Sequence, residues 1–438
     1  MNKHVLILGA GLVSQPIIDY LFEKTDFQLT VADILEENAS RAIKGNMRGR
    51  SATLDVNDDE RLGTLIADSD LVVSLLPYTL HGIVAKHCLE AGKHMVNASY
   101  VSDEMRTFDT PAKEKDLLFL CEIGLDPGID HMSAMQIIHD VQKRGGKVTE
   151  FVSVCGGLPA PEANDNPFGY KFSWSPKGVL LAGNNSAQYI AEGGVKKIPA
   201  EQLFHSTTPM TIDGREFEAY PNRDSTSYEE VYGLDGIDLL MRGTLRYAGW
   251  HDLILALKAL NLTEEIPVAA GRHSYADILA LASNCDRDTL KAGVASKLSM
   301  SGDAPVMQAL EWLGLFNDEK VEFPETTVID ALADVMNKKM AYATGERDMV
   351  VLQHQFTAVY PDVTEKITST LFDYGIPNGD SSMARTVSLP LAIAVRLILE
   401  DKIDLKGVQI PVDPVIYEPV LAELKTLGIA FEEKTTQL

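Results

Sequence analysis

The chain is poor in the residues that build crosslinked or metal-holding scaffolds. It has four cysteines in 438 residues, widely scattered and without C-x-x-C spacing. This scatter argues against a disulfide framework and against a structural zinc site, and it favours a reducing, cytoplasmic environment. The histidines His81, His87 and His94 are expected on different elements, and no H-x-x-x-H spacing occurs. We therefore expect no metal cofactor.

Long apolar runs and positive charge are also scarce. The run Leu389–Leu399 is interrupted by Arg396, and with no apolar stretch of 18 residues we expect no membrane span. The 39 Lys and Arg residues are outnumbered by 63 Asp and Glu, for a net charge of -24. The negative electrostatic field of such a surface repels nucleic acid and anionic lipid, so neither is an expected partner. An anionic substrate would need specific arginines to create a local positive pocket.

The remaining composition is that of an ordinary globular protein, with 45% hydrophobic and 23% charged residues. The length suggests two or three domains. Up to residue 121, short apolar runs alternate with helical patterns, which predicts a doubly wound parallel sheet. The apolar start leads into a glycine turn without a clear cleavage site, so we interpret it as a strand and not as a signal peptide. The predicted strands are His4–Leu8, Gln28–Asp33, Ala52–Val56, Leu71–Leu76, His94–Ala98 and Leu117–Cys121.

The sequence pattern changes further along the chain. Loops rich in Gly, Pro and Asn follow residue 121, helical patterns dominate 245–343, and strand patterns return as a hairpin at 348–360 and 366–374. An apolar helix at 388–400 is expected to pack on the first domain. The fold prediction is α/β: an N-terminal Rossmann domain, a mixed α/β substrate domain and a helical insertion. The predicted boundaries are 1–124 plus 388–438 for the Rossmann domain, 125–244 plus 345–387 for the substrate-binding and dimerisation domain, and 245–344 for the insertion.

The first turn carries a dinucleotide-binding pattern. The string ILGAGLVS places Gly9, Gly11 and Ser14 in G-x-G-x-x-S spacing, directly after a predicted strand and before a predicted helix. Gly9 permits the tight turn, Gly11 lets the backbone approach a pyrophosphate, and a small third residue lets the helix pack on the strand. The phosphates are then expected at the helix N-terminus, where free N–H groups favour anions.

Asp33 ends the second predicted strand, 19 positions after Ser14. An acid at this place hydrogen-bonds the adenosine ribose 2′-hydroxyl and repels a 2′-phosphate, so it favours NAD over NADP. The nearby Arg41 and Lys44 could still accommodate a phosphate, which leaves NADP open.

Four loop motifs resemble those of a known family. They are GLDPGIDHM (124–132), CGGLPAPEANDNPFGYKFSWSP (155–176), YPNRDS (220–225) and RGTLRY (242–247), in that order. Together they resemble the saccharopine dehydrogenase family, in its glutamate-forming branch, also called saccharopine reductase. The resemblance spans essentially the whole chain and implies a homodimer and a Rossmann domain completed by the C-terminal segment.

The resemblance also implies a reaction in lysine metabolism. Saccharopine, a secondary amine, is oxidised by NAD(P)⁺ and hydrolysed to L-glutamate and 2-aminoadipate 6-semialdehyde, or formed in the reverse direction. Fungal NADP-dependent members carry a basic residue near position 33. Asp33 departs from that pattern and moves the expectation toward NAD.

Candidate substrate contacts follow from the three carboxylates of saccharopine. Guanidinium groups match carboxylate geometry, which makes Arg223 in YPNRDS and Arg246 in RGTLRY candidates. Thr244 and Leu245 are expected to supply hydroxyl or backbone contacts in the same turn. The alternative for either arginine is a structural ion pair on this acidic protein.

Candidate catalytic residues are Asp126, Tyr100 and Cys155. Asp126 follows the last Rossmann strand, where ligands bind, and could take a proton or hold the substrate ammonium; the alternative is a cap on the next helix. Ser99 and Tyr100 follow the preceding strand and are expected to contact substrate, with Tyr100 a proton relay or a packing aromatic. Cys155 is a proton-transfer group or a small buried residue. We expect His131 to be structural.

The resemblance suggests further cofactor contacts in both halves of the chain. They are Leu12, Val13, Asp55, Val56, Ser74, Leu75, Leu76, Ser173, Trp174 and Ser175.

Two other functions compete with this one. The first is a related carboxyalkyl-amine dehydrogenase, for example of the carboxynorspermidine type, although a polyamine would call for several pocket acids. The second is a non-catalytic cofactor-binding scaffold, since fold alone does not fix function. Arg223 and Arg246 favour the tricarboxylate, and together with Asp126 they argue against the scaffold.

Overall fold

The computed structural model describes residues 3–173 and 175–438, and the chain divides into two compact units. The first unit comprises Met1–Val148, Val231–Gly233 and Leu352–Leu438, and the second comprises Thr149–Glu230 and Leu234–Val351. The three-domain division, with its boundaries, stays a prediction.

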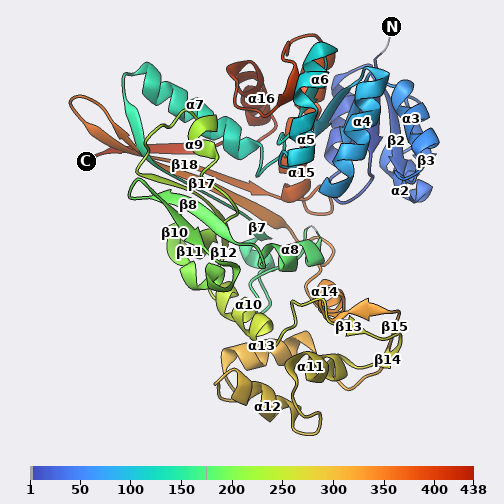
Figure 1. The fold of residues 1–438 in the computed structure, drawn as a ribbon, viewed down its shortest axis with the longest axis vertical. Helices are drawn as coiled ribbons and strands as arrows, with labels where there is room; N and C mark the ends of the chain where they lie inside the picture. Colours follow the sequence, from blue (N-terminus) through green and yellow to red (C-terminus); the bar gives the residue numbers. More distant parts are fainter. Residues whose placement is uncertain (1–2, 174) are drawn as a thin grey trace. The chain divides into compact units, whose positions relative to one another are not determined.

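The first unit contains a seven-stranded sheet in the order β19-β6-β5-β4-β1-β2-β3 (Figure 1). All of its strand pairs are parallel. The order reverses between β1 and β4, which confirms the doubly wound Rossmann prediction. The strands are β1 His4–Leu8, β2 Gln28–Asp33, β3 Gly49–Thr53, β4 Leu71–Ser74, β5 His94–Asn97, β6 Leu118–Leu120 and β19 Gly407–Gln409.

Helices cover both faces of this sheet. One set of packed neighbours is α1, α2 and α15, and another is α3, α4, α5 and α6. Further helices, α7 and α16, pack on one another. The bounds are α1 Gln15–Lys24, α2 Glu36–Ile43, α3 Asp59–Ala67, α4 His81–Ala91, α5 Asp103–Thr107, α6 Asp109–Glu114, α7 Ile129–Lys143, α15 Ser382–Leu399 and α16 Pro414–Thr426.

Two sequence expectations are wrong in this unit. β3 is Gly49–Thr53 and not Ala52–Val56, because its register against β2 pairs Leu29 with Gly49 and Asp33 with Thr53. His81 and His87 both lie on α4, and only His94 is on another element, where it begins β5. Six residues along a helix place the two side chains on different faces.

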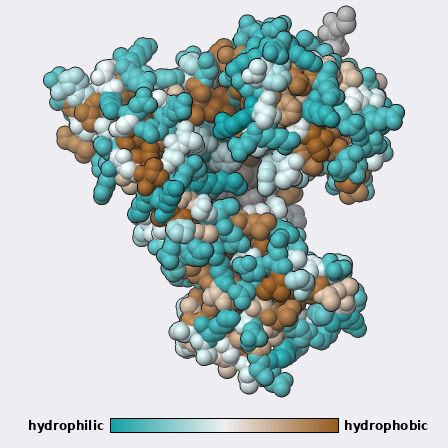
Figure 2. Space-filling model, viewed as in Figure 1, coloured by the Kyte–Doolittle hydropathy of each residue, from teal (hydrophilic) through white to brown (hydrophobic). Residues whose placement is uncertain are grey.

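Helix α15 begins six residues earlier than predicted, at Ser382. By length and composition it is apolar enough to cross a membrane, yet 78% of its 18-residue window is buried inside the protein. It packs on α1, on α16 and on strands β4 and β5. Its apolar character is therefore explained by a core position. On the face seen in Figure 2, hydrophobic side chains form small patches separated by hydrophilic ones.

The second unit contains a mixed sheet in the order β10-β11-β12-β7-β17, with the hairpin β8-β9 beside β12. β12 runs parallel to β7 and antiparallel to β11. The strands are β7 Lys147–Pro159, β8 Ala187–Ala191, β9 Gly194–Ile198, β10 Thr208–Ile212, β11 Arg215–Pro221, β12 Leu239–Tyr247 and β17 Asp348–Val359. β17 continues into the first unit, where it neighbours β18 Thr364–Tyr374, which pairs with β20 Glu432–Gln437.

The predicted helical insertion is helical in the structure. It also contains two short antiparallel strand pairs that the sequence pattern did not indicate, β13 with β16 and β14 with β15. The helices of this unit are α8 Pro176–Ala182, α9 Tyr228–Val231, α10 Trp250–Ala259, α11 Tyr275–Ser283, α12 Leu290–Lys297, α13 Pro305–Leu313 and α14 Val328–Lys339. The short strands are β13 Pro267–Val268, β14 Gly271–His273, β15 Val321–Phe323 and β16 Thr326–Thr327.

Candidate active site

The turn after β1 lies where the strand order reverses. β1 and β4 are parallel neighbours, with Leu8 opposite Ser74. Gly9 has φ 99°, and a Cβ added there would lie 3.0 Å from the carbonyl oxygen of Leu75. Both the backbone conformation and the close approach of the β4 loop therefore require glycine.

Gly11 differs from Gly9, because neither a positive φ nor a close protein neighbour requires glycine there. A Cβ at Gly11 would meet no protein atom within 4 Å, and Leu12 is 73% exposed. The turn is held from inside the protein, because the buried Ser14 hydroxyl donates to the Gly11 carbonyl at 2.8 Å and the Ser388 hydroxyl donates to the Val13 carbonyl. Open backbone at the start of α1 suits a pyrophosphate.

Asp33 is tied to this turn. Its Oδ2 accepts the backbone N–H of Ala10 at 2.8 Å. Its Oδ1 accepts the N–H of Leu35 at 3.0 Å and the side-chain amide of Asn38 at 3.2 Å. The half-buried carboxylate is thus fixed beside the glycine turn, where a ribose hydroxyl is expected.

Asp55 and Val56 lie beyond β3 and not at its end. Asp55 Oδ1 accepts the backbone N–H and the side-chain amide of Asn57, both at 2.9 Å. Val56 is buried in the apolar core between the sheet and α3 and α4. These contacts give both residues a local structural role, and their contact with a cofactor stays a prediction.

A buried histidine links the ends of β4 and β5. Ser74 Oγ lies 2.9 Å from His81 Nδ1, and His81 Nε2 lies 2.8 Å from Ser99 Oγ. Burial lowers the pKa of His81 to about 4, so its ring is neutral at physiological pH. Leu75 and Leu76 follow β4, and the Leu75 N–H donates to the Leu8 carbonyl at 2.8 Å.

Two predicted catalytic residues meet in the same unit. The Tyr100 hydroxyl donates to Asp126 Oδ1 at 2.9 Å, and both residues are half-buried. Asp126 precedes Gly128, the N-cap of α7, by two residues, so it lies outside the capping position considered as its alternative. Tyr100 therefore orients the Asp126 carboxylate.

A second buried network surrounds His131. Its Nε2 lies 2.8 Å from Glu122 Oε2, and its Nδ1 lies 2.6 Å from the Tyr232 hydroxyl. Glu122 Oε1 accepts the N–H of Val101 at 2.9 Å. Both ring nitrogens of His131 are engaged, as expected for a structural histidine.

In the second unit, three predicted substrate or catalytic residues share one face of the sheet. Thr244 and Leu245 lie on strand β12 and not in the predicted turn. Cys155 on β7 is opposite Thr244, and Thr244 is opposite Tyr220 on β11. Arg246, two positions along from Thr244, has the same facing. Leu245 faces the other way and is fully buried, so it contributes backbone only, its carbonyl accepting from Arg246 Nη1 at 2.8 Å.

Arg246 is a buried charge among aromatic rings. It is 7% exposed, and its Cζ lies 5.0 Å from the ring centroid of Tyr170 and 5.5 Å from that of Trp250. In the described part of the chain, its Nε has no hydrogen-bond partner, and no carboxylate lies within ion-pair distance. Glu218, opposite it on β11, is instead bonded to the backbone N–H groups of Gly249 and His251. Burial raises the pKa of the nearby Tyr220 phenol, and the charge of Arg246 opposes that rise.

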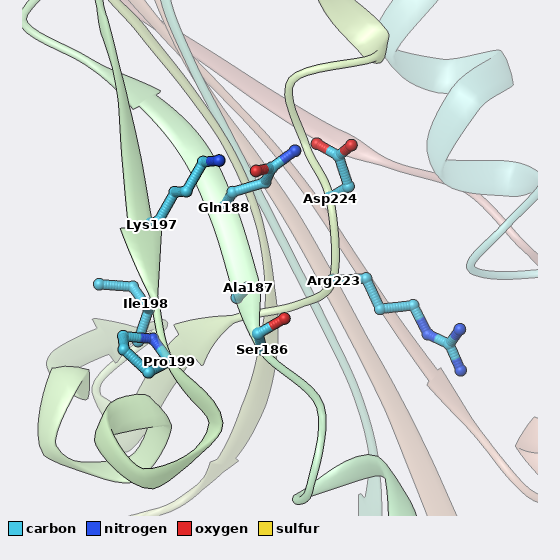
Figure 3. Close-up of a pocket in the computed structure, with 8 residues that line it drawn as sticks. All are labelled: Ser186, Ala187, Gln188, Lys197, Ile198, Pro199, Arg223 and Asp224. Carbon is cyan, nitrogen blue, oxygen red and sulfur yellow. The ribbon is translucent and has the colours of Figure 1, made fainter.

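Arg223 is exposed and has φ 53°. Its carbonyl accepts the N–H of Gln188 at 2.8 Å, which fixes the YPNRDS loop on β8. Arg223 and Asp224 line a cavity of about 500 Å³ together with residues of β8 and β9. In Figure 3 the guanidinium of Arg223 points away from Lys197 and the other residues of that wall.

The predicted cofactor segment 173–175 is only partly described. Ser173 is buried, and its hydroxyl has no partner among the described residues. Trp174 lies outside the described residues. Ser175 is the N-cap of α8, where its side chain accepts the N–H of Gly178 at 3.2 Å. Within residues 3–173 and 175–438, no group of three or more His, Cys, Asp or Glu is arranged to hold a metal ion.

Two family models match the chain in tandem. The saccharopine dehydrogenase NADP binding domain matches residues 5–120, and the saccharopine dehydrogenase C-terminal domain matches residues 124–429. The chain belongs to the saccharopine dehydrogenase family. This confirms the resemblance drawn from the four loop motifs.

Relatives in this family match over nearly the whole chain. The Saccharomyces cerevisiae saccharopine dehydrogenase (NADP(+), L-glutamate-forming) is 40% identical, with 99% of this chain and 100% of the relative covered. The mitochondrial alpha-aminoadipic semialdehyde synthase of Bos taurus is 38% identical, with 99% of this chain and 48% of that protein covered. The structure of apo histidine-tagged saccharopine dehydrogenase (L-Glu forming) from Saccharomyces cerevisiae has a TM-score of 0.90, 38% identity and 99% and 100% coverage.

Sequence reasoning missed three contributors to the candidate site in this saccharopine dehydrogenase family member. They are His81, Glu122 and the aromatic rings around Arg246. His81 bonds residues 7 and 18 positions away, and Glu122 bonds residues 9 and 21 positions away, so these contacts join different elements. Tyr170 lies inside the quoted motif 155–176, and Trp250 follows RGTLRY by three residues, which was a signal that could have been used.

A matched pair of substitutions separates the two glycines of the turn. Gly9→Ala should destabilise the protein by about 1–3 kcal/mol, because it places a Cβ against the Leu75 carbonyl at positive φ. Gly11→Ala should leave stability unchanged and weaken dinucleotide binding, because its Cβ projects into open space. Urea unfolding and NADH fluorescence titration measure the two effects. Equal stability loss in both variants would contradict this division of roles.

Proposed function

We propose that the chain is an NAD(P)-dependent, L-glutamate-forming saccharopine dehydrogenase. The balanced reaction is saccharopine + NAD(P)⁺ + H₂O to L-glutamate + 2-aminoadipate 6-semialdehyde + NAD(P)H + H⁺. Family membership supports the proposal, as do the printed names of the Saccharomyces cerevisiae and Pyricularia oryzae relatives, both saccharopine dehydrogenases forming L-glutamate.

The observation that carries the proposal is the environment of Arg246. A buried guanidinium without a carboxylate partner is costly, and proteins normally pair such a charge. Tyr170 and Trp250 stabilise the cation through their ring faces but accept no hydrogen bond from its Nε. A carboxylate of an amino-acid substrate supplies the missing acceptor and compensates the charge.

The first unit has the residues that a dinucleotide requires. Gly9, Gly11 and Ser14 shape the turn at the N-terminus of α1 for the pyrophosphate, and Asp33 provides the ribose acceptor. A dinucleotide held by these residues would supply the hydride acceptor for oxidation of the carbon that bears the secondary amine. The described residues include no metal-binding group, and the proposal uses none.

Proton handling is assigned to Asp126 with Tyr100. The Tyr100 hydroxyl holds the Asp126 carboxylate in one orientation at 2.9 Å. The carboxylate can then hold the substrate ammonium or accept a proton released as water adds to the imine carbon. Cys155 lies in the row with Thr244 and is a second proton-transfer candidate. Ser99, Thr244 and the Leu245 backbone complete the proposed substrate contacts, together with Arg223.

We propose NAD as the preferred dinucleotide, although the family model that matches residues 5–120 is an NADP binding domain and several relatives are named for NADP(+). Asp33 presents a negative charge where a 2′-phosphate would sit, and α2 begins with Glu36 and Glu37. The nearby cations already have acid neighbours on the surface, since Arg41 pairs with Glu37 at 3.4 Å and Lys44 pairs with Asp19 at 2.8 Å.

The remaining sequence expectations join this proposal. They are a cytoplasmic homodimer with the three domains bounded as predicted, no nucleic-acid or membrane partner, and cofactor contacts from Leu12, Val13, Asp55, Val56, Ser74, Leu75, Leu76, Ser173, Trp174 and Ser175.

The purified protein should reduce NAD⁺ when given saccharopine, because all the groups named above serve that reaction. NADH absorbance measures the rate, and NADP⁺ and carboxyalkyl polyamines are the parallel substrates. Faster turnover of a carboxyalkyl polyamine would favour the related dehydrogenase. No turnover with any substrate would exclude the enzyme.

Arg246→Met should raise the KM for saccharopine by about tenfold to a hundredfold, because it keeps the packing and removes the carboxylate fork. NADH affinity should not change. Lys258→Met is the matched control, since Lys258 donates to Gly183 and Asn184 inside the same unit. A KM no higher than that of the control would contradict the role of Arg246.

Asp33→Ser should shift the ratio of kcat/KM for NAD⁺ over NADP⁺ toward NADP⁺ by about tenfold to a hundredfold, and Asp33→Arg should shift it further. The reason is the loss of a charged ribose acceptor and of its repulsion toward phosphate. Glu60→Gln, an exposed acid on α3, controls for the change in net charge. An unchanged ratio in both Asp33 variants would overturn the NAD assignment.

A further inference from the structure

The first unit contains a hydrogen-bonded chain that crosses the carboxyl ends of two neighbouring strands. It runs from Ser74, the last residue of β4, through His81, the first residue of α4, to Ser99, just beyond β5. The two hydrogen bonds are 2.9 Å and 2.8 Å long. Ser74 is 1% exposed and His81 3% exposed, whereas Ser99 is half-buried. The chain is thus closed at Ser74 and accessible at Ser99.

The burial of Ser74 gives this chain a direction. Within the described residues, the Ser74 hydroxyl has one hydrogen-bond partner, His81 Nδ1. If Nδ1 carried the proton, the Ser74 hydroxyl would accept it and its own proton would be buried without an acceptor among the described protein residues, which is unfavourable. Ser74 therefore donates to Nδ1, and the proton of the neutral ring is on Nε2. His81 in turn donates to Ser99 Oγ.

The consequence appears at Ser99. Its oxygen accepts the proton from His81, so its own O–H is left to donate to another acceptor. The backbone of Ser99 is also held. Its N–H donates to Asn97 Oδ1 at 2.9 Å, and its carbonyl accepts the backbone N–H of Glu122 at 3.1 Å. A fixed hydroxyl with a directed proton is a preorganised donor.

Burial keeps this arrangement intact over the working pH range. The pKa of His81 is lowered to about 4, so the ring remains neutral above pH 5. A protonated ring would donate from both nitrogens, which would leave the Ser74 proton without an acceptor.

We propose that His81 is a positioning residue, which holds the Ser99 hydroxyl as a hydrogen-bond donor to a carboxylate of the amino-acid substrate. This inference rests on the proposed function for the identity of the substrate. His81 then contributes to substrate binding through Ser99. The Ser74 hydroxyl is the first donor in this chain of hydrogen bonds.

A double-mutant cycle on saccharopine oxidation tests the inference. Ser99→Ala and His81→Leu should each lower kcat/KM by about tenfold to a hundredfold, mainly through KM, with NADH affinity unchanged. In the double variant, His81→Leu should add less than about threefold, because its effect passes through Ser99. His81→Gln should restore most of the loss, since its amide can donate where Nε2 did.

His87 provides the matched control. It lies on the same helix, is 7% exposed and bonds to the Asp59 carboxylate at 2.9 Å, away from Ser99. His87→Leu should change kcat/KM by less than about threefold. Losses from His81→Leu and Ser99→Ala that add fully, or an equal loss from His87→Leu, would overturn the proposal and leave His81 a packing residue.

The histidine ring nitrogens give a readout that does not depend on activity. In ¹⁵N-labelled wild-type protein, the His81 signal, identified by its loss in His81→Gln, should show an unprotonated Nδ1 and a protonated Nε2. The opposite tautomer would overturn the proposal. Absence of saccharopine turnover by the wild-type enzyme would instead refute the proposed function, so the two failures are distinguishable.

Discussion

The close approach of Gly9 to the Leu75 carbonyl is the constraint on which the first unit depends. It brings the loops after β1 and β4 together at the point where the strand order reverses. From the β1 side, Ala10 reaches the Asp33 carboxylate. From the β4 side, Ser74 begins the hydrogen-bonded chain toward Ser99. A side chain at position 9 would separate the two loops and move both sets of groups.

The second unit depends on a different kind of constraint. Strand register places Cys155, Thr244 and Arg246 on one face of the sheet, and Gly156 lets β7 approach β12 so closely that a Cβ would lie 2.4 Å from the Leu245 carbonyl. The aromatic rings then remove the Arg246 guanidinium from water without pairing its charge. Burial, which usually disfavours a charge, here prepares it for an anionic ligand.

Much of the fold could be predicted because the sequences of its buried strands are continuous apolar runs. β1 and β2 match their predicted bounds, and β4 and β5 end within two residues of them. β3 was misplaced because it is an edge strand with polar residues, while Leu54 and Val56 continue the apolar pattern beyond it as core residues outside the strand. The apolar pattern of a segment indicates which residues are buried, whereas the strand register decides where hydrogen-bonded pairing ends.

The candidate site was predictable only where a motif carried it. Gly9 and Asp33 follow from the spacing of one turn, and Arg246 follows from the RGTLRY motif, most of which forms the end of strand β12. The relation of Ser74 to Ser99 through His81 could not be predicted, because it requires knowing that β4 and β5 are neighbours. The same holds for His131 and Tyr232, which are distant in sequence and bonded at 2.6 Å. That Arg246 has no acid partner among the described residues is equally a property of packing, which no local string reveals.

The placement of α15 has a consequence for synthesis of the chain. This helix covers α1 and touches β4 and β5, and Ser388 within it bonds the carbonyl of Val13 in the glycine turn. A ribosome therefore releases the first six strands long before the segment that covers one of their faces. Until residues near 400 have emerged, the nascent nucleotide-binding sheet has an apolar surface without its cover. Apolar surface exposed in this way is prone to aggregation until α15 is made.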